Sequence, residues 1–420
     1  PGIAGYSLKI DFDTNALTLN SMTAGSLISG NGTFSVNNEA HIVNWYTVDN
    51  LSGDGELLKL NFTVKDSAAE GTIPVSVSLN DGLDSNLSNE DGVAVPAAFT
   101  VGGVRVGKAQ SGTFGNLTWR LSDDGTLTIS GSGEMEYATS YPWDTYKDII
   151  RKVVVENGVT SIGMGAFGFC DVLEEVVFSD TVETIEDGAF GFSPKLQTIT
   201  FGTGLQEIGP FAFEYCDSLE EITIPKSVTK LYGCSFEGNP KLQNIYVENG
   251  NAAYRDMDGV LYNSGKDTLI AFPGGRTGTY QIPGSVKALD RSAFYSSNLT
   301  EVVLPNGLTT IDDYCFDSSN ISRIVLPGRL TTMGTGTFFG CKQLKTVTIP
   351  GNIKTVPESA FSRSGLETVT LEDGITAIEK EAFLSCAITK ITVPSSVTSI
   401  GEHALGYEAN RMNYDQIAGF

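Results

Sequence analysis

The sequence has few basic residues and almost no histidine. Its 420 residues include 27 lysines and arginines against 50 aspartates and glutamates, a net charge of -23, and only two histidines. A charge of this sign repels phosphate backbones and anionic membranes, so no nucleic acid is expected as a partner. His41 and His403 lie in different predicted domains, where they cannot share a triad or a metal site, and we interpret both as structural or surface residues.

Long apolar runs are also absent. No stretch of about 18 apolar residues occurs, so no membrane span is predicted. The chain lacks a charged and then apolar leader, and it opens at Pro1 as though an upstream segment had been removed or left out. Apolar residues still make up 40% of the chain, enough for a core. Abundant Gly, Ser, Thr and Asn with the acidic balance favour a secreted or wall-displayed protein.

Sequence motifs of common enzyme classes are missing. Neither G-x-S-x-G nor a P-loop occurs. The S-x-x-K match at Ser227 to Lys230 overlaps the regular spacing of the repeat described below, so we do not interpret it as a catalytic motif. Glu174-Glu175 and Glu220-Glu221 recur at the start of successive strands, whereas a glycosidase needs two acids facing each other across its substrate. We therefore predict that the chain is not an enzyme, has no catalytic residues and uses no cofactor.

Metal sites are not indicated either. Asp11 to Asn15 begins like a calcium loop, but Gly is missing from the sixth position and Glu from the twelfth, so a turn at a strand end is predicted. A second acidic stretch has no recognised calcium spacing, and calcium binding there is left open. Its residues are Asp81, Asp84, Asn86, Asn89, Glu90 and Asp91.

A repeat of 22 or 23 residues fills the chain from Val159 onward. Two aliphatic residues three apart are followed five residues later by an aromatic, as in Val159, Ile162 and Phe167. A fixed period of this length is typical of a solenoid, in which each unit buries its apolar face only against its neighbours. Ten units end at Phe167, Phe190, Phe213, Phe236, Phe294, Phe316, Phe338, Phe361, Phe383 and Leu405.

Each repeat also contains a short run in which apolar and polar residues alternate, as in Leu219 to Pro225. Such a run predicts one strand per repeat, and stacked repeats then give a continuous parallel sheet. Most of the six cysteines occupy one position of the repeat, three residues after the aromatic, so we predict free, buried thiols and no zinc site. These are Cys170, Cys216, Cys341 and Cys386, while Cys234 and Cys315 precede their aromatics.

The repeat, read as L-x-x-I-x-I-P-x-x-V-x-x-I-x-x-x-A-F-x-x-C, resembles the BspA-like class of bacterial leucine-rich repeats. The resemblance covers about 290 residues and rests above all on the Ala-Phe pairs. Ser235-Phe236, Cys315-Phe316 and Thr337-Phe338 depart from it slightly. The resemblance implies a curved leucine-rich-repeat solenoid with its parallel β-sheet on the concave side, displayed on a bacterial surface and associated with adhesion and host or matrix binding.

Two segments complete the solenoid, which we place at 159–420 with its N-terminal cap at 109–158. In the cap, a hairpin turns at Asp123 to Gly125, a short helix begins near Pro142, and the first ladder strand lies near Val153. Between Val247 and Ile282 an insertion of about 12 residues lengthens one repeat. Its turn signals predict a hairpin protruding near 250–280, either a binding loop or a tolerated outgrowth.

Residues 1–108 lack the repeat and predict a β-sandwich. Its order of strands and its Gly5-Tyr6 and Asp13 resemble a cohesin domain, with the family's first strand falling before Pro1. The resemblance implies a receptacle for dockerin modules, and the likeness of such sandwiches to carbohydrate-binding modules keeps sugar binding open. The predicted strands are 5–12, 40–46, 56–64, 73–79 and 98–106.

The predicted binding surface is the outward face of the repeat strands, where threonine recurs. We expect a monomeric, extracellular bacterial surface protein that mediates adhesion through this face, with a host matrix or cell-surface protein as ligand. The alternative is a cohesin-bearing scaffold or carbohydrate-binding component of a polysaccharide-degrading assembly, with a dockerin module or a glycan as partner. The candidate residues are Thr200, Thr223, Tyr246, Val303, Val325, Thr348, Thr370 and Thr392, with Glu221 and Arg323 in a second row.

Overall fold

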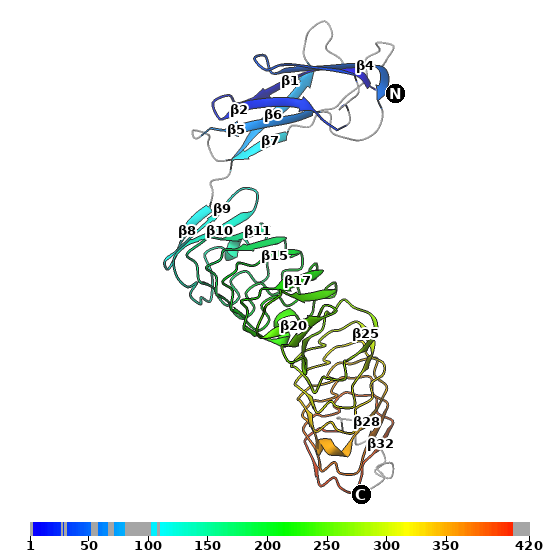
Figure 1. Cartoon of the computed structure of the whole chain (residues 1–420). Coiled ribbons are helices and arrows are strands. Elements are labelled where there is room, and N and C mark those ends of the chain that lie inside the picture. The colour runs from blue at the N-terminus through cyan, green and yellow to red at the C-terminus, as the bar shows by residue number, and fades with distance from the viewer. Residues whose placement is uncertain are drawn as a thin grey trace. The chain divides into compact units, whose positions relative to one another are not determined.

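The computed structural model describes residues 3–26, 28, 32–51, 58–65, 71–79, 102–106 and 110–405. The chain divides into two compact units, Pro1–Ala109 and Gln110–Phe420 (Figure 1). The acidic stretch from Asp81 to Asp91 lies outside the described residues, as do 98–101 of the last predicted strand.

The first unit is a sandwich of two antiparallel sheets. The larger has the strand order β3-β4-β1-β6-β7, and the smaller pairs β2 with β5. Side chains from both sheets form a core that includes Tyr6, Ile10, Met22 and Trp45, which confirms the predicted sandwich. The strands are β1 (Ile3–Phe12), β2 (Leu17–Ala24), β3 (Thr33–Asn37), β4 (Ile42–Leu51), β5 (Leu58–Val64), β6 (Gly71–Leu79) and β7 (Gly102–Val106).

Two details of the first unit differ from the sequence prediction. The strands β2 and β3 were not predicted, and His41 lies in the turn before β4 rather than in a strand. Its φ of 53° belongs to the left-handed region, which ends the turn. The predicted turn after β1 is present, because the Asp13 carboxylate accepts a hydrogen bond from the Asn15 backbone N–H at 2.8 Å.

The second unit begins with the N-terminal cap. Strands β8 (Gln110–Phe114), β9 (Leu117–Leu121) and β10 (Thr126–Gly131) are antiparallel, and β10 then pairs in parallel with β11 (Lys152–Val155). A 3-10 helix, η1 (Asp144–Tyr146), connects the two directions and is the short helix predicted after Pro142. The cap thus converts a hairpin into the parallel ladder of the repeats.

Each repeat makes one turn of the solenoid, which has three sides. Two of these sides carry parallel strands. The strand ladder, which holds the predicted strand of each repeat, is interrupted, so the sequence prediction of one continuous sheet is wrong. Its four sections, in order, are β11, β13 (Glu175–Phe178) and β15 (Thr198–Thr200); β17 (Glu221–Ile224) and β19 (Asn244–Val247); β23 (Gly278–Gln281) and β25 (Leu299–Val303); and β28 (Thr346–Ile349), β30 (Thr368–Leu371) and β32 (Lys390–Thr392).

A second ladder, itself divided among three sheets, consists of two-residue strands at the Val-x-x-Ile positions, where the sequence predicts no strand. The isoleucine side chain points inward and the pairing residues register repeat on repeat, as in Ile162 with Ile185. The strands are β12 (Ser161–Ile162), β14 (Thr184–Ile185), β16 (Glu207–Ile208), β18 (Lys230–Leu231), β24 (Ala288–Leu289), β26 (Thr310–Ile311), β27 (Thr332–Met333), β29 (Thr355–Val356), β31 (Ala377–Ile378) and β33 (Ser399–Ile400).

The third side is the turn that carries the repeat aromatic. Its backbone also bonds from repeat to repeat, since the Phe167 N–H donates to the Ala189 carbonyl at 2.8 Å and the Phe190 N–H to the Ala212 carbonyl at 2.9 Å. Left-handed residues flank the aromatic two positions before and after it, as Gly165 (φ 62°) and Phe169 (φ 61°) do around Phe167. This alternation points successive backbone groups along the solenoid axis.

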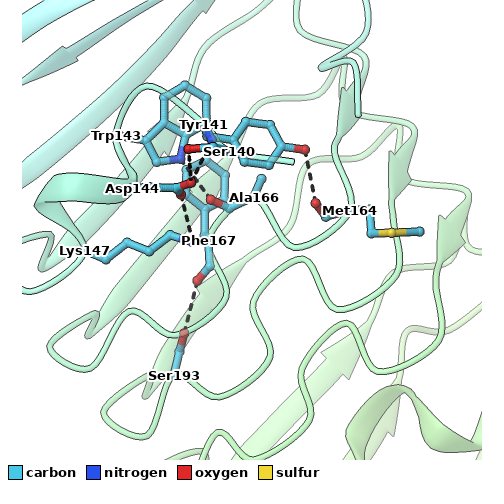
Figure 2. A network of polar contacts seen from close by, with 9 residues as sticks. All are labelled: Ser140, Tyr141, Trp143, Asp144, Lys147, Met164, Ala166, Phe167 and Ser193. Atoms are coloured by element: carbon cyan, nitrogen blue, oxygen red, sulfur yellow. Dashed lines mark hydrogen bonds and ion pairs between the residues drawn. The ribbon is translucent and has the colours of Figure 1, made fainter. Parts of the chain in front are cut away.

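Stacked aromatic rings fill the core behind this turn. The repeat rings lie 4.9 to 6.0 Å apart in two runs, one from Phe167 to Phe236 and one from Phe272 to Phe383. Trp143 of the cap covers the first ring, with its centroid 5.5 Å from that of Phe167 (Figure 2). Its indole Nε1 donates to the Ala166 carbonyl at 2.9 Å.

The cysteine position of the repeat is also a hydrogen-bond position. The Ser193 hydroxyl donates to the Phe167 carbonyl at 3.2 Å (Figure 2), and the Cys341 thiol to the Phe316 carbonyl at 3.0 Å. Asn239 takes the same role in its repeat, with its amide 2.9 Å from the Phe213 carbonyl. All six thiols are free, and burial is confirmed for all of them except the half-buried Cys386. Desolvation raises the pKa of the Cys341 thiol to about 12 and leaves it unreactive.

The insertion forms a three-stranded unit, β20 (Tyr254–Met257), β21 (Val260–Asn263) and β22 (Thr268–Ala271). The predicted hairpin is present as the antiparallel pair β21 and β22. Its predicted protrusion is wrong, because Leu261 and Tyr262 are fully buried and β22 pairs in parallel with β24. Phe272 belongs to the aromatic stack but follows Leu269 by only three residues. In the other repeats the aromatic follows the second aliphatic residue by five, so this spacing did not predict Phe272. The insertion is part of the solenoid wall.

Two short 3-10 helices, η2 (Gly233–Phe236) and η3 (Gly351–Ile353), complete the second unit. No helix in the part of the chain that the structure describes is long and apolar enough to cross a membrane.

Candidate binding surface

The outward residues of the strand ladder fall into the two rows predicted from the sequence. In the first row Val177 pairs with Thr200, Thr223 with Tyr246, and Thr348 with Thr370 and then Thr392. In the second row Glu175 pairs with Thr198, Glu221 with Asn244, and Glu301 bridges to Arg323. The alternation of buried and exposed residues along each strand therefore aligns side chains from many repeats on one face.

The first row is mostly uncharged and open to solvent. Thr200, Thr223, Thr348 and Thr392 are exposed, and Val303 and Thr370 are half-buried. Two residues of the row expose apolar surface: Tyr246 is 39% exposed and Val325 is 67% exposed. Val325 follows the short bridge at Arg323, where the strand ladder is interrupted, and lines a hollow of about 250 Å³ beside β25. The row offers hydroxyl groups and apolar surface rather than charge.

Two carboxylates of the second row, Glu175 and Glu301, pair with bases of the adjacent repeat, whereas Glu221 makes no ion pair in the described residues. Glu175 lies 2.9 Å from Lys152, and Glu301 lies 3.6 Å from Arg323. One position earlier, Glu174 pairs with Arg151 at 3.0 Å. Exposed pairs of this kind contribute little to stability, at most about 1 kcal/mol each. Their effect here is to neutralise the rim of the strand face.

A second cluster of polar groups lies on the turn side, where the insertion separates neighbouring repeats. The hydroxyls of Tyr215 and Tyr295, 80 residues apart in sequence, lie 2.8 Å from each other. Burial raises the pKa of Glu237 to about 7, and the negative charges of Glu214 and Asp317 add to the rise while Ser292 and Arg291 oppose it. Burial also raises the pKa of Asp317 to about 6. This cluster was not predicted, although Glu214, Glu237, Tyr295 and Asp317 each directly follow a repeat aromatic.

Glu237 should make stability depend on pH. A carboxyl whose pKa rises on folding from its ordinary 4.5 to about 7 contributes stability fully below pH 4.5, and that stability is lost as the pH rises through 7. Glu237→Gln is therefore expected to raise the melting temperature at pH 8 relative to the parent chain and to leave it nearly unchanged at pH 4.5. The measurement is calorimetry at both pH values, with the exposed Glu372→Gln as control. Equal shifts at the two pH values would contradict the assignment.

Family models agree with both units. A model of the BspA-type leucine-rich-repeat region, in six copies, matches residues 145–256 and 279–411. The chain belongs to the BspA-type leucine-rich-repeat family. A cohesin-domain model matches residues 1–106, so the sandwich is cohesin-like. Among the curated proteins none matches the chain.

Solved structures of other proteins are similar to parts of this BspA-type protein. A leucine-rich-repeat protein from Eubacterium ventriosum is 29% identical over 71% of this chain and 95% of its own, with a TM-score of 0.59. A leucine-rich cell-surface protein from Faecalibacterium prausnitzii is 23% identical over 70% of this chain and 95% of its own, with a TM-score of 0.45. The pneumococcal vaccine antigen PcpA is 20% identical over 74% of this chain and 97% of its own, with a TM-score of 0.46.

Leucine-rich-repeat and cohesin domains both imply protein binding. In this BspA-type protein the structure aligns the candidate residues within each section of the ladder and separates the sections from one another. The separations were not predicted, and they divide the strand face into distinct patches.

Proposed function

We propose that this chain is an extracellular bacterial surface protein that mediates adhesion by binding a protein ligand on its strand face, and that it binds rather than catalyses. The observation that carries the proposal is the alignment of uncharged threonines on successive strands, exposed at Thr348 and Thr392 and half-buried at Thr370. Such a rigid row presents hydroxyls at fixed spacing without an entropic cost of ordering a loop. Membership of a family of interaction modules supports the same proposal.

A matched pair of variants tests the strand face. Thr348 and Thr332 are both exposed strand threonines, but Thr348 lies on the strand ladder and Thr332 on the second ladder. The full chain is screened against immobilised host matrix proteins and cell-surface proteins. We expect Thr348→Lys to weaken binding by about tenfold or more and Thr332→Lys to leave it unchanged. Equal binding by both variants would argue against the strand face.

The cohesin domain supports a second candidate function, a scaffold that receives dockerin modules or glycans through residues 1–106. Binding of a dockerin panel and a glycan array to the full chain tests it. If this function is correct, the dockerin or glycan signal persists in Thr348→Lys, because the substitution lies in the other unit. A signal that disappears in Thr348→Lys would move the dockerin or glycan site to the solenoid.

A further inference from the structure

The strand ladder is open between β15 and β17. Each of these strands pairs on its far side, β15 with β13 and β17 with β19, but no strand pairing joins them to each other. The same two repeats remain joined elsewhere, through the pairing of Ile208 with Leu231 and through the rings of Phe213 and Phe236, whose centroids lie 6.0 Å apart. The opening is therefore confined to the strand face.

A groove follows this opening. Two hollows of about 420 and 360 Å³ lie end to end along it and share Gln197, Thr198 and Glu221. Ile199 in β15 and Phe201 directly after it point inward yet are half-buried, whereas Val176 and Ile222 in the neighbouring strands are buried. The groove thus has an apolar floor between two strand edges whose main-chain groups face it.

The carboxylates beside the groove lack basic partners. Elsewhere on the strand face an acid at the start of a strand pairs with a base of the adjacent repeat, as Glu367 does with Lys345 at 3.1 Å. Glu220 and Glu221 make no ion pair in the described part of the chain, because the adjacent repeat places Gln197 and Thr198 beside them. Both carboxylates are exposed, and Lys241 and Lys226 line the same hollows without forming an ion pair with them in the described residues. Glu220 and Glu221 therefore present unpaired negative charge at the groove.

We propose that this groove binds an extended, basic segment of a protein partner, which adds as a strand along the edge of β17; the proposal rests on the proposed protein-binding function. Unpaired strand edges supply main-chain donors and acceptors that an extended peptide satisfies by β-augmentation. An added strand parallel to β17 places a basic side chain opposite Glu221, an apolar one over Ile199, and a small polar one beside Thr223. The free carboxylates also repel a second copy of this acidic chain, which disfavours self-pairing at the same edge.

The test uses the full chain and fluorescently labelled peptides of six residues in which Val alternates with Lys and Thr. Binding is followed by fluorescence anisotropy. We expect the peptide to bind about tenfold more tightly than its counterpart with Glu in place of Lys, and N-methylation of the valine amides to weaken binding by a similar factor. Glu221→Lys should reverse the charge preference, while Glu372→Lys, an exposed acid on another repeat, should leave it unchanged.

Equal binding of the Lys and Glu peptides, or equal effects of Glu221→Lys and Glu372→Lys, would overturn the proposal. Insensitivity to N-methylation would also overturn it, because β-augmentation requires the peptide N–H groups. These outcomes are independent of the Thr348→Lys experiment, which concerns β28 in another section of the ladder. If the strand face binds protein but shows no charge selection at β17, the proposed function stands and only the peptide-binding role of the groove is rejected.

Discussion

Replacing Phe213 with alanine is expected to lower the free energy of unfolding of the solenoid by about 3–5 kcal/mol, the usual cost of removing a buried aromatic ring. The Phe213 side chain is fully buried and lies between two rings, 5.4 Å from Phe190 and 6.0 Å from Phe236. The neighbouring backbone bonds through the same turn, so it has little freedom to close the cavity. Urea unfolding followed by circular dichroism measures the loss.

Phe169→Ala is the matched control for this prediction. Phe169 stacks on Phe192 with ring centroids 4.9 Å apart, but it is 66% exposed. Its removal opens no interior cavity, and we expect a loss well under about 1 kcal/mol. Equal unfolding midpoints for Phe213→Ala and the parent chain would show that the aromatic stack does not stabilise the fold.

Trp143→Ala is expected to cost a similar amount, about 3–5 kcal/mol, for a different reason. Trp143 is fully buried at the end of the stack, where it covers Phe167 and contacts Tyr141 with ring centroids 5.2 Å apart. Its removal also leaves the Ala166 carbonyl without the indole donor. Because a solenoid depends on its end caps, hydrogen exchange should accelerate first in the repeats nearest the cap.

Trp143→Phe separates the two contributions of the indole. The smaller ring keeps the stack on Phe167 but cannot donate a hydrogen bond, so we expect a loss of about 1–2 kcal/mol. Faster exchange confined to the last repeats in Trp143→Ala would contradict the capping role. Equal losses for the two variants would show that the hydrogen bond, not the stack, closes the end.

The main features of the fold could be predicted from the sequence because burial recurs at fixed spacing. The repeat aromatics and the inward aliphatics lie where the period places them, and the cohesin-like sandwich follows from alternation in its strands. The second ladder was missed because a two-residue strand has no alternation to detect. The left-handed turn positions were missed because Phe169, Phe192 and Tyr215 occupy them instead of glycine.

The groove could be predicted only in part. Gln197 to Phe201 has the same alternation as every other repeat strand, and loss of pairing with β17 depends on main-chain spacing that the pattern does not encode. The unpaired charge is different. Comparing repeats would show that the repeat before Glu220 and Glu221 has Gln197 and Thr198 at the positions where Arg151 and Lys152 pair with Glu174 and Glu175. That comparison was within reach of the sequence alone.

The insertion has a consequence for how the solenoid can change its length. The core residues of the solenoid form two clusters, one containing Phe213 and the other Phe316. The two clusters meet at β20 to β22, within the insertion. Each cluster is built from repeats that contact only their neighbours, so whole repeats can be gained or lost on either side without disturbing the other. Duplication and deletion of single repeats on the C-terminal side of the insertion thus change the reach of that arm, while the groove beside β17 stays intact.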